Sequence, residues 1–273
     1  MQTRTIASVT ALALLFTVAC ADSPDPMGAP VGQAPIKNGI PTGPAFGAVG
    51  ALMYDFNGNG LVDLLCTGSL VSPTVFLTAA HCVSWLPADA PLQVSFEPSL
   101  LPVPASYIAA TGFAYDPEFG HDQAQPHDLA VVFLPAGSTD GITPYNLPRA
   151  GYLDELNASG SLKKVAFVNV GYGNSSNQTG RPTFGYDGLR NQSQSLFRAL
   201  TPAWLGLRMN AAATGFGGDC YGDSGGPKFL ASDLTTVVAT VVTGDAYCRA
   251  TSWDYRLDTE AARNFLGQFL TLP

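Results

Sequence analysis

The sequence has few charged side chains. Asp, Glu, Lys and Arg make up 12% of its 273 residues, whereas hydrophobic residues make up 46%. This composition excludes an intrinsically disordered chain and indicates a packed globular one. Basic residues are the scarcer charge, with 13 Lys and Arg against 21 Asp and Glu and a formal net charge of −8. Since phosphate backbones are bound by basic surfaces, we exclude nucleic acid as a partner.

The sequence also lacks an apolar run long enough for a comfortable membrane span. Near the N-terminus, Arg4 precedes a short apolar stretch at residues 6–18, and Ala19-Cys20-Ala21 fits a small-x-small cleavage site. Residues 1–21 are therefore predicted to be a signal peptide of bacterial type, which implies a secreted or periplasmic protein. A lipoprotein signal with an acylated Cys20 is the second choice, because threonine stands where such signals carry leucine. Residues 22–35 are Pro-rich, as is typical of a propeptide or tether.

Cysteine is sparse and lacks metal-binding spacing. Of five cysteines, Cys20 belongs to the signal region. An even set in an exported chain indicates disulfides, for which the sequence alone allows three connectivities. No C-x-x-C pair occurs, so a zinc site is not favoured, and we predict no cofactor. The remaining four are Cys66, Cys82, Cys220 and Cys248.

Long helical periodicity is missing until the C-terminus. Gly (29) and Pro (21) are frequent and separate short apolar segments, a pattern typical of sandwiches and barrels. From Asp258 onward, apolar residues follow the i, i+3, i+4, i+7 spacing of an amphipathic helix. The expected strands cover residues 47–54, 61–71, 74–80, 92–96, 106–114, 129–134, 163–171, 196–201, 236–243 and 251–257.

Three short segments carry the chemistry. "CYGDSGGP" at residues 220–227 displays Ser224 among glycines, where a hydroxyl can attack a carbonyl if a base lies nearby. "LTAAHC" at residues 77–82 places His81 after a buried strand, and "HDLAVVFL" at residues 127–134 places Asp128 before another. Taken singly, these residues fit a turn serine, a structural histidine and a solvated strand-end aspartate. Together they supply a nucleophile, a base and an acid.

These segments and their His–Asp–Ser order resemble the chymotrypsin/trypsin family of serine proteases. The resemblance spans roughly residue 36 to the C-terminus. It implies an all-β fold of two six-stranded antiparallel β-barrels with the active site between them and a C-terminal helix. The protease domain would cover residues 36–273, with one barrel at about 36–145, the other at about 146–257 and the helix at about 258–271.

The resemblance also implies roles for individual residues. Ser224 would be the nucleophile, His81 the general base and Asp128 the residue that orients the imidazole. The backbone amides of Gly222 and Ser224 would form the oxyanion hole. The disulfides would be Cys66–Cys82 and Cys220–Cys248, which clamp the loops that carry His81 and Ser224.

Activation in this family depends on a new N-terminal amine that pairs with the acid before the nucleophile, here Asp223. Ile36-Lys37-Asn38-Gly39 resembles the start of the mature chain. Pro35 precedes it, whereas family zymogens carry Arg or Lys there. We therefore expect a zymogen that another protease cleaves to expose Ile36.

The specificity pocket departs from the trypsin pattern. Gly218 stands at the pocket-base position, where trypsin-like members carry aspartate, and Asp219 follows it. Asp219 either faces the pocket, where it would attract Lys or Arg, or points into a hydrogen-bond network, since a one-residue shift reverses side-chain direction. Gly244 matches a pocket-wall glycine, and Trp253 stands where a second small residue is common. Val242 replaces a serine that supports the catalytic aspartate, which weakens the support of that residue.

One further motif lies outside this constellation. Residues 55–63 resemble the start of a calcium loop, with Asp55, Asn57, Asn59 and Asp63 as candidate ligands, but the twelfth position is Cys66. The alternative is a β-hairpin turn, which Asn-Gly favours. We expect His121 and His127 to be surface or loop residues.

The sequence thus predicts an exported, monomeric serine endopeptidase that acts on proteins or peptides. Two alternatives remain: a non-catalytic binding protein on the same fold, and an esterase that uses the same triad.

Overall fold

The computed structural model describes Ile36, residues 38–176, Arg181 and residues 183–273. These residues belong to one compact unit, Gln33–Pro273. The predicted signal peptide, with Cys20, and the Pro-rich segment that ends at Pro35 lie outside the described residues.

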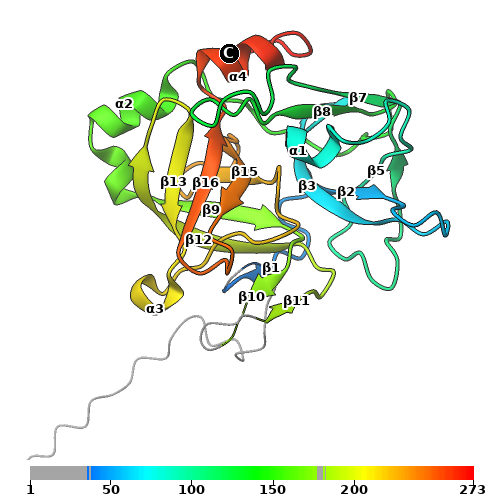
Figure 1. Ribbon diagram of the computed structural model, residues 1–273, viewed down its shortest axis with the longest axis horizontal. Coiled ribbons are helices and arrows are strands. Elements are labelled where there is room, and N and C mark those ends of the chain that lie inside the picture. Colours follow the sequence, from blue (N-terminus) through cyan, green and yellow to red (C-terminus); the bar gives the residue numbers. More distant parts are fainter. Residues whose placement is uncertain (1–35, 37, 177–180, 182) are drawn as a thin grey trace, which may run out of the picture. The chain divides into compact units, whose positions relative to one another are not determined.

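The first sheet is an open, curled half-barrel of seven antiparallel strands in the order β6-β5-β2-β3-β4-β8-β7 (Figure 1). Its inner strands are continuous runs of buried apolar residues, as in β2, with sequence VGALMY. Such runs form strands that are covered on both faces. The strands are β2 (Val49–Tyr54), β3 (Asp63–Ser72), β4 (Val75–Thr78), β5 (Gln93–Ser95), β6 (Ile108–Ala109), β7 (Gly112–Tyr115) and β8 (Ala130–Phe133).

The second sheet closes into a six-stranded antiparallel barrel. Strand β9 pairs with both β14 and β12, which joins the two ends of the order β12-β13-β16-β15-β14-β9. Strand β1 (Ile40–Pro41) precedes the first sheet in the chain but pairs with β12 of this one. The strands are β9 (Ala166–Gly171), β12 (Asn191–Leu200), β13 (Trp204–Arg208), β14 (Pro227–Leu230), β15 (Ala239–Gly244) and β16 (Thr251–Arg256). A separate hairpin joins β10 (Ser175–Ser176) to β11 (Phe184–Gly185).

Helices are short. The C-terminal helix α4 (Glu260–Leu266) begins where the side chain of Thr259 accepts a hydrogen bond from the Ala262 amide, and it buries Ala262, Phe265 and Leu266. The others are α1 (Ala80–Val83), α2 (Tyr152–Ala158), the 3₁₀-helix η1 (Ser161–Lys164) and α3 (Ala211–Thr214). Among the described residues, no helix has the length and apolar character that a membrane crossing requires.

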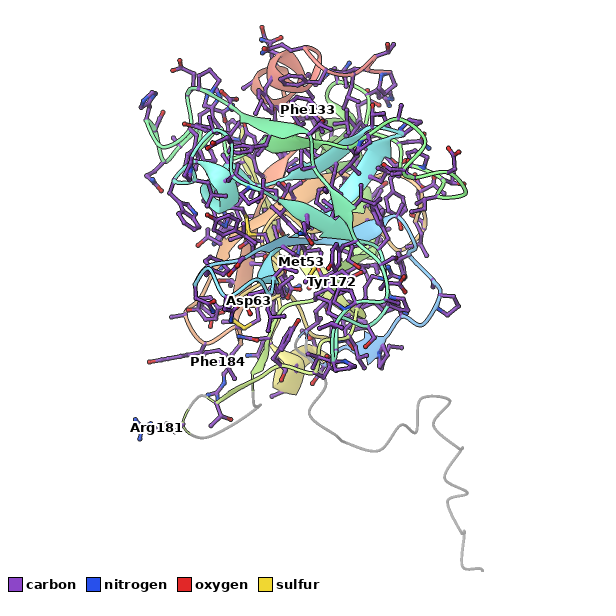
Figure 2. All side chains as sticks on the ribbon, turned by 90° about the vertical axis from the view of Figure 1, so that its right-hand side faces the viewer. Met53, Asp63, Phe133, Tyr172, Arg181 and Phe184 are labelled. Carbon is purple, nitrogen blue, oxygen red and sulfur yellow. A yellow bond between two sulfur atoms is a disulfide. The ribbon has the colours of Figure 1, made fainter. Side chains whose placement is uncertain are left out.

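One hydrophobic core joins the two sheets. It contains Met53 and Val131 of the first sheet together with Val168 and Phe229 of the second, and α4 packs against it. Tyr172, which follows β9, is fully buried in this core; its hydroxyl donates to the Glu97 carbonyl at 2.8 Å. Figure 2 shows Met53 and Tyr172 in the interior of the unit. This core holds the two sheets together, so loops from both can contribute to one site.

The predicted all-β double barrel with a C-terminal helix is confirmed, with one barrel closed and the other a half-barrel. Strands β1, β10, β11, β13 and β14 and helices α1, α2 and α3 were not predicted. Lys163 and Lys164, expected at a strand start, lie in η1, and β9 begins after them.

Candidate active site

The predicted base and acid meet at the end of two paired strands. Strands β4 and β8 pair antiparallel, with Thr78 opposite Ala130. His81 lies on α1, just after β4, and Asp128 lies just before β8. This pairing brings His81 Nδ1 to 2.7 Å from Asp128 Oδ2, while the His81 amide donates to Asp128 Oδ1 at 2.9 Å. His81 is therefore held through both its imidazole ring and its backbone amide.

The two partners differ in exposure. The Asp128 side chain is 3% exposed and the His81 ring 33% exposed. The carboxylate is shielded from water, which strengthens its contact with the ring, while the ring remains accessible. Val242 lines the cavity that His81 also lines, and its side chain has no hydroxyl to offer Asp128.

Ser224 lies on the loop that leads into β14. It shares a cavity of about 450 Å³ with His81, so the structure brings the three predicted catalytic residues together. In the part of the chain that the structure describes, no hydrogen bond joins the Ser224 hydroxyl to the His81 ring. Catalytic hydrogen bonds often form only once substrate is bound.

The loop before Ser224 has the backbone conformation that only glycine adopts readily. Gly222 has φ +96°, and a Cβ there would lie 3.0 Å from Gly173 Cα. Among the described residues, neither the Gly222 amide nor the Ser224 amide donates a hydrogen bond. Both remain available for an oxygen atom in the cavity.

Thr67 on β3 fastens this loop to the first sheet. Its hydroxyl donates to the Gly222 carbonyl at 2.9 Å, and its amide donates to the Ser224 carbonyl at 2.9 Å. No sequence motif marks Thr67 for this role, because these partners are more than 150 residues away in the chain.

Both residues of the predicted activation pair are buried. Ile36 is fully buried, and Asp223 is 1% exposed. The Asp223 carboxylate accepts from the amides of Gly173 and Cys220, each at 2.8 Å. Burial raises the pKa of Asp223 to about 7, against the opposing effect of these amides.

The disulfides Cys66–Cys82 and Cys220–Cys248 are both formed. The first joins β3 to the helix that carries His81. The second joins the segment before Ser224 to the loop after β15.

Only some of the predicted pocket residues line the cavity. Asp219 and Gly244 line the cavity with Ser224. Trp253 does not line it: its ring packs against Gly206, where a Cβ would lie 2.7 Å from it, and under Arg198 at 5.4 Å. Neighbouring residues of a strand point to opposite faces, and in β16 the buried neighbours of Trp253 are Ser252 and Asp254. Trp253 therefore lies on the other face of β16 from Ser252 and Asp254, and it does not narrow the cavity.

Asp219 points into a buried hydrogen-bond network, which is one of the two alternatives given for it above. Its carboxylate pairs with Lys228 of β14 and accepts from the Ser252 hydroxyl at 2.9 Å. Lys228 is fully buried and also donates to Asn169 Oδ1 at 2.7 Å. A lysine inside the apolar strand Pro227–Leu230 is itself a sequence signal of a buried ion pair, because lysine is rarely buried without a partner.

Met209 covers Gly218, the predicted pocket base. A Cβ on Gly218 would lie 2.1 Å from Met209 Sδ, so the thioether already fills that space. Met209 lines the cavity and Gly218 does not.

The calcium candidates lie in the hairpin between β2 and β3, where Tyr54 pairs with Asp63 (Figure 2). The Asp55 carboxylate accepts from the amides of four following residues, and that of Gly60 is the leading cause of its lowered pKa. Among the described residues, only Cys66, His81 and Cys82 group as possible metal ligands, and both sulfur atoms belong to a disulfide. Calcium binding here stays a prediction.

A second aspartate–histidine pair lies outside the cavity that holds Ser224. His127 Nδ1 is 2.9 Å from Asp116 Oδ2, and both residues line a larger cavity of about 910 Å³ beside α4. His121 is exposed and lies 3.5 Å from Glu118.

Comparisons with known proteins agree with this architecture. Solved structures with the same fold include HL collagenase (TM-score 0.64, 20% identity, 85% of this chain and 97% of that one). They also include the scabies mite inactivated protease paralogue S-I1 (TM-score 0.60, 17% identity, 85% and 97%). A third is a mutant of human heparin binding protein (TM-score 0.62, 18% identity, 85% and 96%). Comparison with curated proteins gives no match.

The family model described as Trypsin matches residues 50–256, a span that contains His81, Asp128 and Ser224. The chain belongs to the trypsin family.

Proposed function

We propose that this protein is an exported serine endopeptidase that hydrolyses peptide bonds through an acyl-enzyme. The observation that carries the proposal is the pair of contacts from Asp128 to His81, at 2.7 and 2.9 Å, together with the cavity that His81 shares with Ser224. A buried carboxylate that holds an accessible imidazole next to a serine is the arrangement that activates a hydroxyl.

In the proposed reaction, Ser224 Oγ attacks the carbonyl carbon of the scissile bond while His81 Nε2 accepts its proton. Asp128 keeps the proton of His81 on Nδ1, facing the carboxylate, which leaves Nε2 free as the base. His81 then returns the proton to the leaving amine, and a water molecule hydrolyses the Ser224 ester by the same route in reverse.

The amides of Gly222 and Ser224 receive the oxyanion. Each such donor contributes about 3–4 kcal/mol to transition-state stabilisation. Thr67 supports them, since its hydrogen bonds to the carbonyls of Gly222 and Ser224 limit rotation of this loop.

Activation would proceed by cleavage before Ile36. A buried carboxylate with a raised pKa lacks a nearby positive charge that would stabilise its ionised form. A free Ile36 amine would supply this charge to Asp223. Because Pro35 precedes the bond, we expect a second protease of different specificity to make this cut.

The rival is a non-catalytic binding protein on the same fold. Among the structural neighbours, one is named an inactivated protease paralogue and one a heparin binding protein. Val242, which leaves Asp128 without a supporting hydroxyl, is the feature that favours this rival. The net charge of −8 disfavours an anionic polymer as the ligand.

The test is labelling by a fluorophosphonate probe, before and after proteolysis that exposes Ile36, with the new N-terminus sequenced. We expect labelling of the processed protein that disappears in Ser224→Ala and persists in Ser159→Ala, an exposed serine on the loop after α2. Absence of labelling once Ile36 is exposed supports the binding protein. Hydrolysis of simple esters without any peptide cleavage identifies an esterase instead. Mass spectrometry of the exported protein distinguishes cleavage after Ala21 from a lipid on Cys20.

A further inference from the structure

The floor of the Ser224 cavity is closed by one side chain. Met209 is 1% exposed and lies in the space that a Cβ of Gly218 would need, 2.1 Å from Sδ. A Cβ on Gly244 would lie 3.7 Å from Met209 Cε. The thioether therefore extends from the base position at Gly218 toward the wall at Gly244, and a long substrate side chain that enters the cavity meets Met209 at its floor.

Two carboxylates line the cavity, those of Asp219 and Asp245, and both already have partners. Asp245 accepts hydrogen bonds from three backbone amides in its own loop, those of Arg249, Ala250 and Thr251. Asp219 lies against Lys228 Nζ, and both side chains are buried. A lysine or arginine of the substrate would have to replace Lys228 as the partner of Asp219. Separating a buried ion pair is strongly unfavourable, because it leaves an uncompensated charge.

Asp254 adds no free negative charge. The Ser252 hydroxyl lies 2.9 Å from Asp219 Oδ2 and 2.8 Å from Asp254 Oδ1. One hydroxyl carries one proton, so it donates to one carboxyl group and accepts from the other. Burial raises the pKa of Asp254 to about 8, which makes Asp254 the protonated donor and Asp219 the acceptor. The cluster of Lys228, Asp219 and Asp254 is thus neutral as a whole at pH 7.

Apart from His81 and Asp245, the walls of the cavity are formed by uncharged residues. They include Val241, Val242 and Thr243 of β15 and the disulfide partners Cys220 and Cys248. Branched and apolar walls above a closed, neutral floor favour a short apolar side chain.

We infer that the substrate residue on the N-terminal side of the scissile bond is short and uncharged, with Met209 and Lys228 as the residues that determine this specificity. The inference rests on the proposed function, because it concerns the substrate of that same site. Met209 excludes long side chains by occupying the floor, and Lys228 excludes cationic ones by neutralising Asp219.

The experiment compares kcat/KM for a series of peptides that differ only at this position: Ala, Val, Leu, Phe, Lys, Arg and Glu. The protein is processed material from the full chain, and its active fraction is titrated with a fluorophosphonate. We expect Ala or Val to exceed Phe by at least tenfold and Lys, Arg and Glu by at least 100-fold. A ratio above one for Arg or Lys over Ala overturns the inference.

Two variants test the determinants. In Met209→Ala, the vacated floor should raise the Leu/Ala and Phe/Ala ratios at least tenfold, since each buried methylene changes discrimination by about tenfold or more. Met53→Ala is the matched control: it truncates a methionine that is 2% exposed in the core of the unit, and its ratios should stay within twofold of the original protein. Lys228→Met frees Asp219 and should raise the Lys/Ala ratio at least tenfold.

These readouts separate the two proposals. Ratios of kcat/KM do not depend on the folded fraction, so a destabilised variant remains informative. An unchanged Phe/Ala ratio in Met209→Ala overturns the role of Met209 even when labelling shows an active enzyme. Absence of fluorophosphonate labelling in the processed protein contradicts the proposed function itself.

Discussion

The hydroxyl of Thr67 donates a hydrogen bond of 2.9 Å to the carbonyl of Gly222, across the boundary between the two sheets. The same hydroxyl accepts from the Tyr172 amide at 3.2 Å. Through these hydrogen bonds Thr67 connects the half-barrel, the closed barrel and the loop that carries Ser224. An active site made from two sheets needs such hydrogen bonds, because its geometry depends on how the sheets are held together.

Replacing Thr67 by valine should lower activity with little effect on substrate binding. Valine keeps the shape of the side chain but removes a hydrogen bond of about 1 kcal/mol and leaves the Gly222 carbonyl without it. We expect kcat to fall about five- to tenfold while KM changes less than twofold. Thr67→Ser retains the hydroxyl and should restore most of kcat; if the serine variant is as slow as the valine variant, the hydrogen bond is not the cause.

The two aspartate–histidine pairs allow a matched comparison. Asp128→Asn should reduce kcat by about 10⁴-fold, because an amide stabilises the wrong tautomer of His81. Asp116→Asn makes the same change at His127, where the ring lies 2.9 Å from the carboxylate, against 2.7 Å at His81. This pair lies outside the Ser224 cavity, so kcat should stay within threefold. Steady-state kinetics on one peptide substrate decide the matter, and equal losses in both variants would remove the special role of Asp128.

The catalytic candidates were predictable because each stands in a short motif: His81 follows and Asp128 precedes a predicted apolar strand, and Ser224 lies among glycines. Short strands separated by Gly and Pro indicated an all-β fold, whereas the arrangement in two barrels came through the resemblance to a family. The pairing of β4 with β8, which brings His81 to Asp128, came only through the resemblance to a family.

The lining of the cavity was not predictable in the same way. The position of Trp253 depends on which face of β16 points inward, and an error of one residue reverses it. Thr67 reaches the site from a strand more than 150 residues away in the chain, and Met209 reaches it from the segment after β13, so no motif marks either residue. Lys228 could have been found, since a lysine within a buried apolar strand requires a buried partner.

Both disulfides should stabilise the fold, to a similar extent. They close loops with sequence separations of 16 and 28 residues, for which loop-closure entropy predicts about 3–4 kcal/mol each. We expect Cys66→Ala/Cys82→Ala and Cys220→Ala/Cys248→Ala to lower the free energy of unfolding by this amount in guanidinium titrations. Loss of less than about 1 kcal/mol in either double variant would show that its loop is restrained by other contacts.

The raised pKa of Asp223 makes the stability of the unprocessed chain depend on pH. In the folded state this pKa is about 7, against 3.8 for an unperturbed aspartate. The stabilisation is complete below the unfolded value and is lost as pH rises through about 7, because folding then requires a buried, unpaired carboxylate.

We therefore expect the unprocessed chain to be less stable at pH 7.5 than at pH 4.5 in urea titrations, and Asp223→Asn to remove this component. Cleavage before Ile36 supplies an amine that should pair with Asp223 and lower its pKa. The processed protein should then lose less stability between pH 4.5 and 7.5 than the unprocessed chain does, and this gain should vanish in Asp223→Asn. If cleavage leaves the pH dependence of the original chain unchanged, the Ile36 amine does not reach Asp223, and activation must depend on another contact of the Ser224 loop.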